Sequence, residues 1–190
     1  MAEVDEASEP HAATWDAGWP QTLDEFERLV ETFQDRLVRY AFRRLGTVQD
    51  AEDVAQDVFV RAYADRSRHK GVVNVNAYLF RMASNLCTDW QRKQRRRNPL
   101  LAEAEVMHVP ATDRDVAEEA AAEEDLRRIE TLLREIPSPQ AEVVQLHVLD
   151  GLRLREIAQV IGRPVGTVKS RLRYGLDKLR KIVLDEPEVF

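Results

Sequence analysis

Cations and small polar residues crowd a short segment near the end of the chain, "VGTVKSRLRYGLDKLRK" (residues 165–181). Another helical pattern, "LREIAQVI" (residues 154–161), precedes it, and Gly162 and Pro164 lie in the turn between the two. Two helices joined by a short turn that contains glycine are typical of the helix-turn-helix, whose second helix lies in the major groove of DNA. The spacing therefore predicts a DNA-binding motif, with an ordinary helix hairpin as the alternative.

The second of these helices divides into two faces when residues are placed about 100° apart. Its apolar face, which would anchor the helix, comprises Val168, Leu172, Gly175, Leu176 and Leu179. The opposite face comprises Gly166, Ser170, Arg173, Tyr174 and Asp177, with Thr167 and Lys169 on its flanks. Small and polar residues near a helix N-terminus can approach base edges, and flanking cations can meet phosphates. Asp177 repels phosphate, so we expect the helix to leave the groove near this residue.

A similar division occurs on a predicted helix from about residue 77 to residue 95. Its apolar stripe comprises Leu79, Met82, Ala83, Leu86 and Trp90. The opposite side comprises Arg81, Asn85, Thr88 and Arg92, and we expect it to be free of carboxylates. This side leads into the cationic run "RKQRRR" (residues 92–97). Amide-bearing positions that lead into a cationic run suit single-stranded or distorted DNA, although a solvated charged surface accounts for the run equally well.

The preceding predicted helix, which Thr47 can cap, has an acidic exposed side. Its buried stripe is expected to comprise Ala51, Val54, Ala55, Val58 and Ala62. The exposed side, called the acidic face below, comprises Asp50, Asp53, Gln56, Asp57 and Val60. Carboxylates repel DNA, so this face indicates either a protein partner or a solvated surface.

Capping and periodicity predict the other helices of the chain. Thr22 and Glu25 form a capping box at the start of a long amphipathic helix, which Gly46 ends. The run "DRDVAEEAAAEEDLRRIETLLREI" (residues 113–136) predicts a further helix, and "PSPQ" leads into one from about residue 140 to residue 149. Helical periods throughout, with few alternating β-branched runs, predict an all-α protein.

The predicted architecture is two small helical bundles joined by a linker, with the helix-turn-helix in the C-terminal bundle. The predicted segments are an acidic tail (1–21), a first bundle (22–98), an acidic linker (99–123), a second bundle (124–184) and a short tail (185–190). The first tail contains Trp15 and Trp19, matches no motif, and is expected to be disordered or to bind a partner.

The net charge of −6 is distributed unevenly along the chain. Residues 81–97 contain six cations and one carboxylate, and residues 151–181 contain nine cations and two carboxylates. Between them, residues 100–135 contain eleven carboxylates and four arginines. Two separate cationic segments favour contact with a polyanion at two places.

Several classes of protein are disfavoured by the composition. No stretch approaches 18 apolar residues and the first 20 residues lack a basic start and an apolar run, so neither a membrane span nor a secretory signal is expected. The single cysteine, Cys87, fits a reducing cytoplasm. The four histidines have no metal-ligand spacing, and no phosphate-binding glycine loop or nucleophile–base motif occurs. We therefore expect no enzyme activity, no metal and no cofactor.

Three segments together resemble the sigma factors of bacterial RNA polymerase, in the extracytoplasmic-function (ECF) group of the sigma-70 family. "DAEDVAQDVFVRAY" (50–63) resembles the segment with which that family binds the clamp helices of the polymerase β′ subunit. "NAYLFRMASNLCTDWQRKQRRR" (76–97) resembles its promoter-melting and −10 recognition segment. "EIPSPQAEVVQLHVLDGLRLREIAQVIGRPVGTVKSRL" (135–172) resembles its −35 binding region.

The resemblance implies a function and partners. It implies a protein that directs core RNA polymerase to promoter DNA through the β′ clamp helices and the β subunit. It also implies restraint by an anti-sigma factor, a cytoplasmic location and no direct membrane contact. Together with the faces above, it implies that the acidic face binds polymerase.

Two sets of residues are then expected to bind promoter DNA. The −10 set comprises Arg81, Asn85, Thr88, Arg92, Lys93, Arg95, Arg96 and Arg97. The −35 set comprises Arg153, Pro164, Gly166, Thr167, Lys169, Ser170, Arg171, Arg173 and Tyr174.

Two positions depart from the family pattern. Tyr78 stands where the family commonly has tryptophan, and Arg153 stands where it commonly has a serine or threonine helix cap. A cation is unfavourable at a helix N-terminus, so we expect Arg153 to contact a promoter phosphate. The alternative function is a stand-alone helix-turn-helix regulator that binds duplex DNA without polymerase, which leaves the acidic face and the −10 set unexplained.

Overall fold

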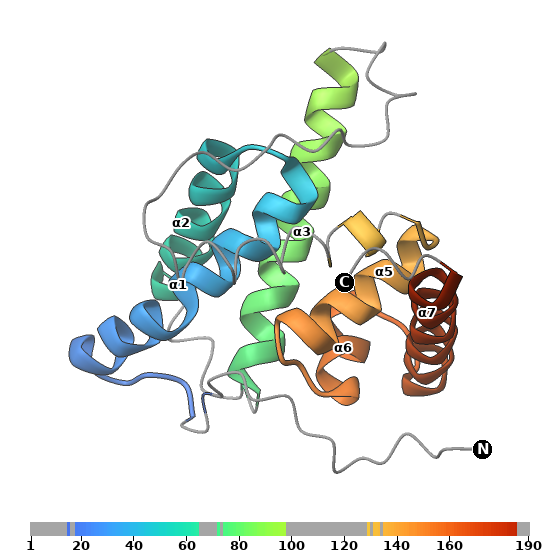
Figure 1. Cartoon of the computed structure of the whole chain (residues 1–190). Coiled ribbons are helices and arrows are strands. Elements are labelled where there is room, and N and C mark those ends of the chain that lie inside the picture. Colours follow the sequence, from blue (N-terminus) through green and yellow to red (C-terminus); the bar gives the residue numbers. More distant parts are fainter. Residues whose placement is uncertain are drawn as a thin grey trace, which may run out of the picture. The chain divides into compact units, whose positions relative to one another are not determined.

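The computed structural model of the protein describes residues 15, 18–64, 72, 74–97, 129, 131–133 and 135–185. Within these residues every regular element is a helix, which confirms the all-α prediction. The chain divides into two compact units, with α1 to α3 in one and α5 and α7 in the other (Figure 1). The predicted linker, residues 99–123, lies outside the described residues.

The first helix, α1 (Leu23–Leu45), begins and ends where the sequence predicts. The Glu25 N–H donates to Thr22 Oγ1 at 3.2 Å, and the Thr22 N–H donates to the Glu25 carboxylate at 3.2 Å. This capping box satisfies two backbone donors that the first turn of a helix leaves without partners. At the other end Gly46 has φ 84° and donates its N–H to the Phe42 carbonyl at 2.8 Å.

The second helix, α2 (Val48–Ala64), is capped by Thr47, whose hydroxyl accepts the Asp50 N–H at 3.3 Å. The same hydroxyl is hydrogen-bonded to the Asp50 carboxylate. Its buried residues are Ala51, Val54, Ala55, Val58 and Ala62, which are the residues of the predicted stripe. The small side chains on this stripe allow α2 to pack closely on its neighbours α1 and α3.

The third helix, α3 (Val75–Arg97), begins two residues earlier than predicted and ends two residues later. It begins early because Asn74 caps it, accepting the Ala77 N–H on Oδ1 at 2.8 Å. Both α1 and α2 pack against α3, so its buried surface is wider than a single stripe. Phe80 and Cys87, outside the predicted stripe, are fully buried, whereas Met82 and Trp90 within it are half-buried.

Residues that precede α1 also belong to the first unit. Trp19, which the sequence analysis assigned to the acidic tail, is only 5% exposed. Its ring meets the ring of Tyr78 edge-on, with centroids 5.5 Å apart. Trp15 donates its indole N–H to the Gly18 carbonyl at 3.0 Å. The tryptophan at position 19 therefore packs on α3, beside the tyrosine that departs from the family pattern.

After the first unit the chain forms α5 (Ser138–Val144), a π-helical turn (Gln145–Leu149), α6 (Leu154–Ile161) and α7 (Val165–Asp185). The first of these helices starts two residues earlier than predicted, because proline is accommodated in a first helical turn. It continues into the π-helical turn, where the Asp150 N–H donates to the Gln145 carbonyl at 3.1 Å. Gly151, with φ 70°, then reverses the chain toward α6.

Helix α7 is anchored against α5 by its predicted apolar face. Val168 and Leu172 are buried, and a Cβ atom on Gly175 would lie 2.7 Å from Val144 Cγ2. The absence of a side chain at Gly175 therefore lets the two helices approach closely. Leu176 was predicted to be buried, but it is 38% exposed. Since α5 contacts α7 at Gly175, Leu176 lies beside this contact and not within it.

Candidate nucleic-acid and protein interfaces

The acidic face lies along the exposed side of α2. Asp53, Gln56, Asp57 and Val60 are exposed, and Asp50 is half-buried against its cap. Asp57 also lies 3.9 Å from the guanidinium of Arg61, one turn further along the helix. Both side chains of this pair are more than half exposed, so the pair contributes little to stability and leaves the carboxylate accessible.

Tyr63, an aromatic side chain that the sequence analysis did not single out, accompanies Val60 on this face. Val60 is 65% exposed and Tyr63 is 43% exposed. The Tyr63 ring meets the ring of Phe26 on α1 at a centroid distance of 5.2 Å. An exposed aromatic ring beside exposed carboxylates combines the two kinds of contact that protein interfaces use. The signal in the sequence was the spacing of Tyr63, three residues after Val60 on a helix.

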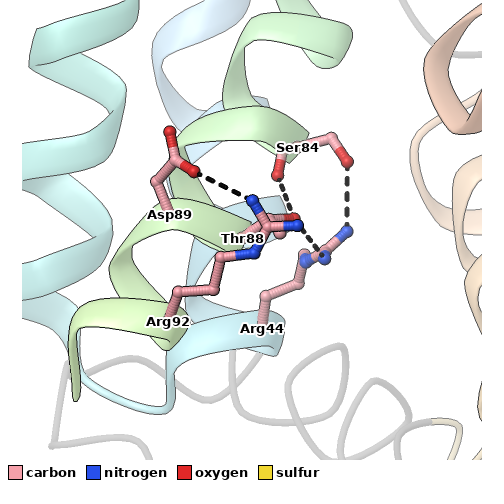
Figure 2. Close-up of polar contacts among 5 residues, drawn as sticks. All are labelled: Arg44, Ser84, Thr88, Asp89 and Arg92. Carbon is pink, nitrogen blue, oxygen red and sulfur yellow. Dashed lines mark hydrogen bonds and ion pairs between the residues drawn. The ribbon is translucent and has the colours of Figure 1, made fainter. Parts of the chain in front are cut away.

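The polar side of α3 brings together the residues that the sequence predicted for single-stranded DNA. Arg81, Asn85 and Arg92 are exposed, and Thr88 is half-buried. The expectation that this side is free of carboxylates is wrong, because Asp89 lies 3.6 Å from the Arg92 guanidinium (Figure 2). Helical neighbours three residues apart share a side, which accounts for the pairing.

The rest of the −10 set follows in the last turns of α3. Lys93 and Arg96 are exposed. The side chains of Arg95 and Arg97 lie outside the described residues. Consecutive cations on an exposed helical turn can meet a polyanion along its backbone.

Arg44, at the C-terminal end of α1, is a polar residue that sequence reasoning missed. Its guanidinium donates to the Tyr40 hydroxyl at 2.9 Å, to Ser84 Oγ at 3.3 Å and to Thr88 Oγ1 at 3.4 Å. Figure 2 shows Arg44 reaching the Ser84 and Thr88 side chains of α3. No local pattern could have revealed these contacts with α3, because the partners are at least 40 residues apart in the chain.

Cys87 is a buried core residue and not a reactive thiol. Burial raises the pKa of its thiol from 9.0 to about 11, an effect that the positive charge of Arg44 partly opposes. Because the thiolate is the nucleophilic form, a pKa this high keeps the group unreactive at neutral pH.

The helix-turn-helix is formed by α6 and α7. Gly162, in the turn, has φ 63°, a conformation that glycine adopts without strain. The Pro164 carbonyl accepts the Thr167 N–H at 2.9 Å and the Val168 N–H at 3.2 Å, and so opens α7. These two hydrogen bonds start α7 directly after the turn.

The predicted −35 residues of α7 lie on its accessible side. The exposed ones are Pro164, Gly166, Lys169, Ser170, Arg173 and Tyr174, and the half-buried ones are Thr167 and Arg171. A Cβ atom on Gly166 would have no neighbour within 4 Å, so packing inside the protein does not require glycine there. Ser170 Oγ donates to the Gly166 carbonyl at 2.8 Å, and the Arg173 guanidinium lies 5.0 Å from the Tyr174 ring centre.

Arg153, the last member of this set, is exposed immediately before α6. Its backbone N–H donates to the Glu156 carboxylate at 2.6 Å, and its carbonyl accepts the Ile157 N–H at 3.0 Å. Glu156 thus supplies one half of a capping box, although position 153 lacks the hydroxyl that supplies the other half. Sequence reasoning noticed the missing hydroxyl but not the glutamate three residues later.

The part of the chain that the structure describes has neither a metal-binding cluster nor a membrane-spanning helix. Within it, no group of three or more histidine, cysteine, aspartate or glutamate residues could hold a metal ion. None of the helices described there has the length and apolar character that crossing a membrane requires.

Two family models match the chain. The model of sigma-70 region 2 matches residues 29–97, which include α2 and α3. The model of sigma-70 region 4 matches residues 126–179, which include the helix-turn-helix.

Known proteins with similar sequences and structures agree with these matches. The chain is 31% identical to the ECF RNA polymerase sigma factor SigW of Bacillus subtilis, over 85% of this chain and 90% of that protein. It is 32% identical to the RNA polymerase sigma-E factor of Streptomyces coelicolor, over 83% of this chain and 85% of that protein. The fold is similar to that of CnrH in its complex with the cytosolic domain of CnrY, with a TM-score of 0.64 and 23% identity over 87% of this chain and 92% of that chain. These findings show that the chain belongs to the sigma-70 family of RNA polymerase sigma factors, in its ECF group.

Proposed function

We propose that this sigma factor binds core RNA polymerase, directs it to promoters with a −35 and a −10 element, and assists promoter opening. The observation that carries the proposal is the presence of two accessible cationic helices, one in each sigma region. Region 2 presents the polar side of α3, and region 4 presents the N-terminal half of α7. Each helix is anchored by its apolar side, which leaves its polar side available for a polyanion.

The acidic face is proposed to bind the β′ clamp helices of polymerase. Its accessible carboxylates, with Val60 and Tyr63 exposed nearby, suit a basic protein surface that has an apolar centre. The same carboxylates repel DNA, so this side of region 2 and the −10 set on α3 serve different partners.

The −10 set is proposed to hold the melted strand. Exposed Asn85 can bond base edges, while Arg81, Arg92, Lys93 and Arg96 can meet phosphates. The −35 set is proposed to lie on duplex DNA, with Gly166 allowing close approach at the start of α7.

An anti-sigma factor is proposed to control the protein. The solved structures with a similar fold include RpoE in complex with the anti-sigma factor NepR from Bartonella quintana, with a TM-score of 0.64, 20% identity, and coverage of 85% of this chain and 98% of that chain. The exposed apolar residues of α7, Leu176 and Leu184, suit such a protein partner.

We infer that the protein works by binding and performs no catalytic step of its own. Polymerase and promoter DNA are its proposed partners, so we place its activity in the cytoplasm, without direct membrane contact. The stand-alone regulator is not favoured, because it leaves the region 2 match over residues 29–97 without a role.

A run-off transcription assay tests the proposal. Core polymerase is incubated with fragmented DNA of the host, with and without the protein, and the start sites are sequenced. We expect new transcripts from defined sites only when the protein is present. A Val60→Asp variant should lose this activity, whereas Arg39→Lys, on an exposed position of α1, should retain it. No transcripts, together with tight and salt-sensitive binding of the free protein to duplex DNA, would instead support the stand-alone regulator.

A further inference from the structure

Arg44 joins α1 to three successive turns of α3. Its guanidinium donates from Nη1 to Ser84 Oγ at 3.3 Å and from Nη2 to Thr88 Oγ1 at 3.4 Å. Its backbone carbonyl accepts the side-chain amide of Gln91 at 2.8 Å. One residue of α1 therefore contacts α3 at positions 84, 88 and 91; Figure 2 shows the first two of these contacts.

This clamped side of α3 borders the side proposed to meet DNA. At about 100° per residue, positions 84, 88 and 91 span roughly 60° of the helix circumference. Positions 81, 85, 88 and 92 span a neighbouring arc of roughly 60°. Thr88 is the residue that the two arcs share. The contact with Arg44 therefore acts directly on a member of the −10 set.

The hydrogen bonds that the Thr88 hydroxyl makes within the protein restrict which further hydrogen bonds it can form. A threonine hydroxyl has one proton to donate and two lone pairs that accept. Thr88 donates its proton to the Ser84 carbonyl at 2.8 Å and accepts a guanidinium N–H from Arg44 at 3.4 Å. One lone pair then remains for an outside partner. In this arrangement the hydroxyl can accept another hydrogen bond but cannot donate one.

We propose that Thr88 reads one promoter base as a hydrogen-bond acceptor, and that Arg44 is the positioning residue that holds it in this state. Phosphate oxygens only accept hydrogen bonds, so an acceptor cannot bind them. In a melted strand the groups that donate belong to the bases: the amino groups of adenine, cytosine and guanine and the ring N–H groups of guanine and thymine. Thr88 therefore contacts a base, and not a phosphate, at one position of the −10 element. This inference rests on the function proposed above.

The guanidinium group accounts for the need for arginine at position 44. A threonine on a helix often donates to the carbonyl four residues back, and this contact alone leaves both lone pairs accessible. The rigid fork of arginine can donate to two hydroxyls one helical turn apart, whereas the single ammonium of lysine lacks this geometry. Arginine therefore both fixes the Thr88 hydroxyl and holds the turn that carries it.

A promoter library with a randomised −10 element tests the inference. Run-off transcription with core polymerase and the full-length protein is followed by sequencing of the templates that yield transcripts. The first variant is Thr88→Val, which removes the hydroxyl and leaves a side chain of nearly the same shape. The second is Arg44→Lys, which keeps the positive charge but removes the planar guanidinium that donates to two hydroxyls. Thr88→Ser keeps the hydroxyl, and Arg39→Lys is a matched control on the same helix as Arg44.

We expect Thr88→Val to lose a base preference at one position by roughly threefold to tenfold, as loss of a single hydrogen bond implies. Arg44→Lys should weaken the preference at that same position, while Thr88→Ser and Arg39→Lys should keep the wild-type profile. A purely structural role for Arg44 would lower the yield from all promoters alike and leave the base profile unchanged, which would overturn the inference.

The assay separates this inference from the proposed function. Wild-type transcripts with an unchanged profile for Thr88→Val would overturn the inference alone. Absence of transcripts with the wild-type protein would overturn the proposed function and the inference together. If Arg44→Lys fails to fold, the comparison of Thr88→Val with Thr88→Ser still decides whether the hydroxyl reads a base.

Discussion

At the scale of single residues, Arg153 combines a poor helix cap with a position suited to phosphate. The Glu156 carboxylate accepts the Arg153 N–H, so α6 retains half of a capping box without a hydroxyl at position 153. We predict that Arg153→Ser adds the missing hydroxyl cap, which is worth about 1 kcal/mol of stability. The same change should also weaken the salt dependence of promoter binding. The slope of the logarithm of the binding constant against the logarithm of the salt concentration should become shallower by about one.

Promoter binding by the holoenzyme between low and moderate salt concentration measures this effect. Arg155→Ser is the matched control, since Arg155 is also exposed but lies on α6 about 200° from position 153. An unchanged slope for Arg153→Ser would show that Arg153 does not contact phosphate.

The buried thiol of Cys87 gives the stability a dependence on alkaline pH. Burial raises its pKa from 9.0 to about 11, so between these values the unfolded chain loses the proton and the folded chain keeps it. Since the unfolded state then binds fewer protons, the free energy of unfolding should fall by about 1.4 kcal/mol per pH unit in this range. Below pH 9 this contribution is fully present.

Urea unfolding at several pH values between 8 and 10.5 measures this dependence. Cys87→Ala removes the thiol. The free energy of unfolding of this variant should therefore fall less steeply with pH than that of the wild type, by about 1.4 kcal/mol per pH unit. Equal slopes for the two proteins would show that the thiol titrates alike in both states.

At the scale of helices, two glycines of α7 have opposite roles. Gly175 lies where a Cβ atom would be 2.7 Å from Val144 Cγ2, whereas a Cβ on Gly166 would have no neighbour within 4 Å. We predict that Gly175→Ala destabilises the second unit by about 1–3 kcal/mol through overpacking. Gly166→Ala should instead stabilise α7 by roughly 0.5–1 kcal/mol and weaken −35 binding.

Thermal unfolding of the full chain and promoter binding measure these two effects, and each glycine variant is the control for the other. Comparing the two variants distinguishes a glycine that is needed for helix packing from one that is needed for the approach of α7 to DNA. Loss of promoter binding without loss of stability in Gly175→Ala would contradict the assigned roles.

Trp19 gives a further prediction at this scale. Its buried ring contacts Tyr78, so Trp19→Ala should destabilise the first unit by about 3–5 kcal/mol, as large-to-small core changes do. Trp15→Ala is the control, because Trp15 is less buried and should cost far less. Equal, small losses for the two variants in denaturant unfolding would show that the segment before α1 does not stabilise the unit.

Local signals made the helices predictable, and distant contacts limited what could be said of the site. The capping box of Thr22 and the small-residue stripe of α2 depend on residues within one or two turns, so the sequence alone was sufficient for them. The burial of Phe80 depends on two helices packing on α3 at once, and a single periodic stripe cannot indicate this. The Arg44 contacts bridge at least 40 residues and leave no local pattern.

At the scale of the whole molecule, the charge distribution sets how DNA binding depends on polymerase. The chain has 34 carboxylates and 28 lysines and arginines, so long-range repulsion opposes the attraction of each cationic helix to DNA. Within a polymerase complex, the two DNA-binding regions act together and each raises the effective concentration of the other at the promoter. Affinity is therefore expected to come from the complex and not from either region alone.

We predict that the free protein binds a promoter fragment at physiological salt no more tightly than about 1 μM, which is the range of non-specific binding. With core polymerase added, binding should reach the range of roughly 1–10 nM that specific complexes show. Fluorescence anisotropy with a labelled promoter measures both values, and a scrambled fragment of equal length is the control. Specific, nanomolar binding by the free protein would mean that region 4 suffices to select a site, which would favour a regulator that acts on duplex DNA without polymerase.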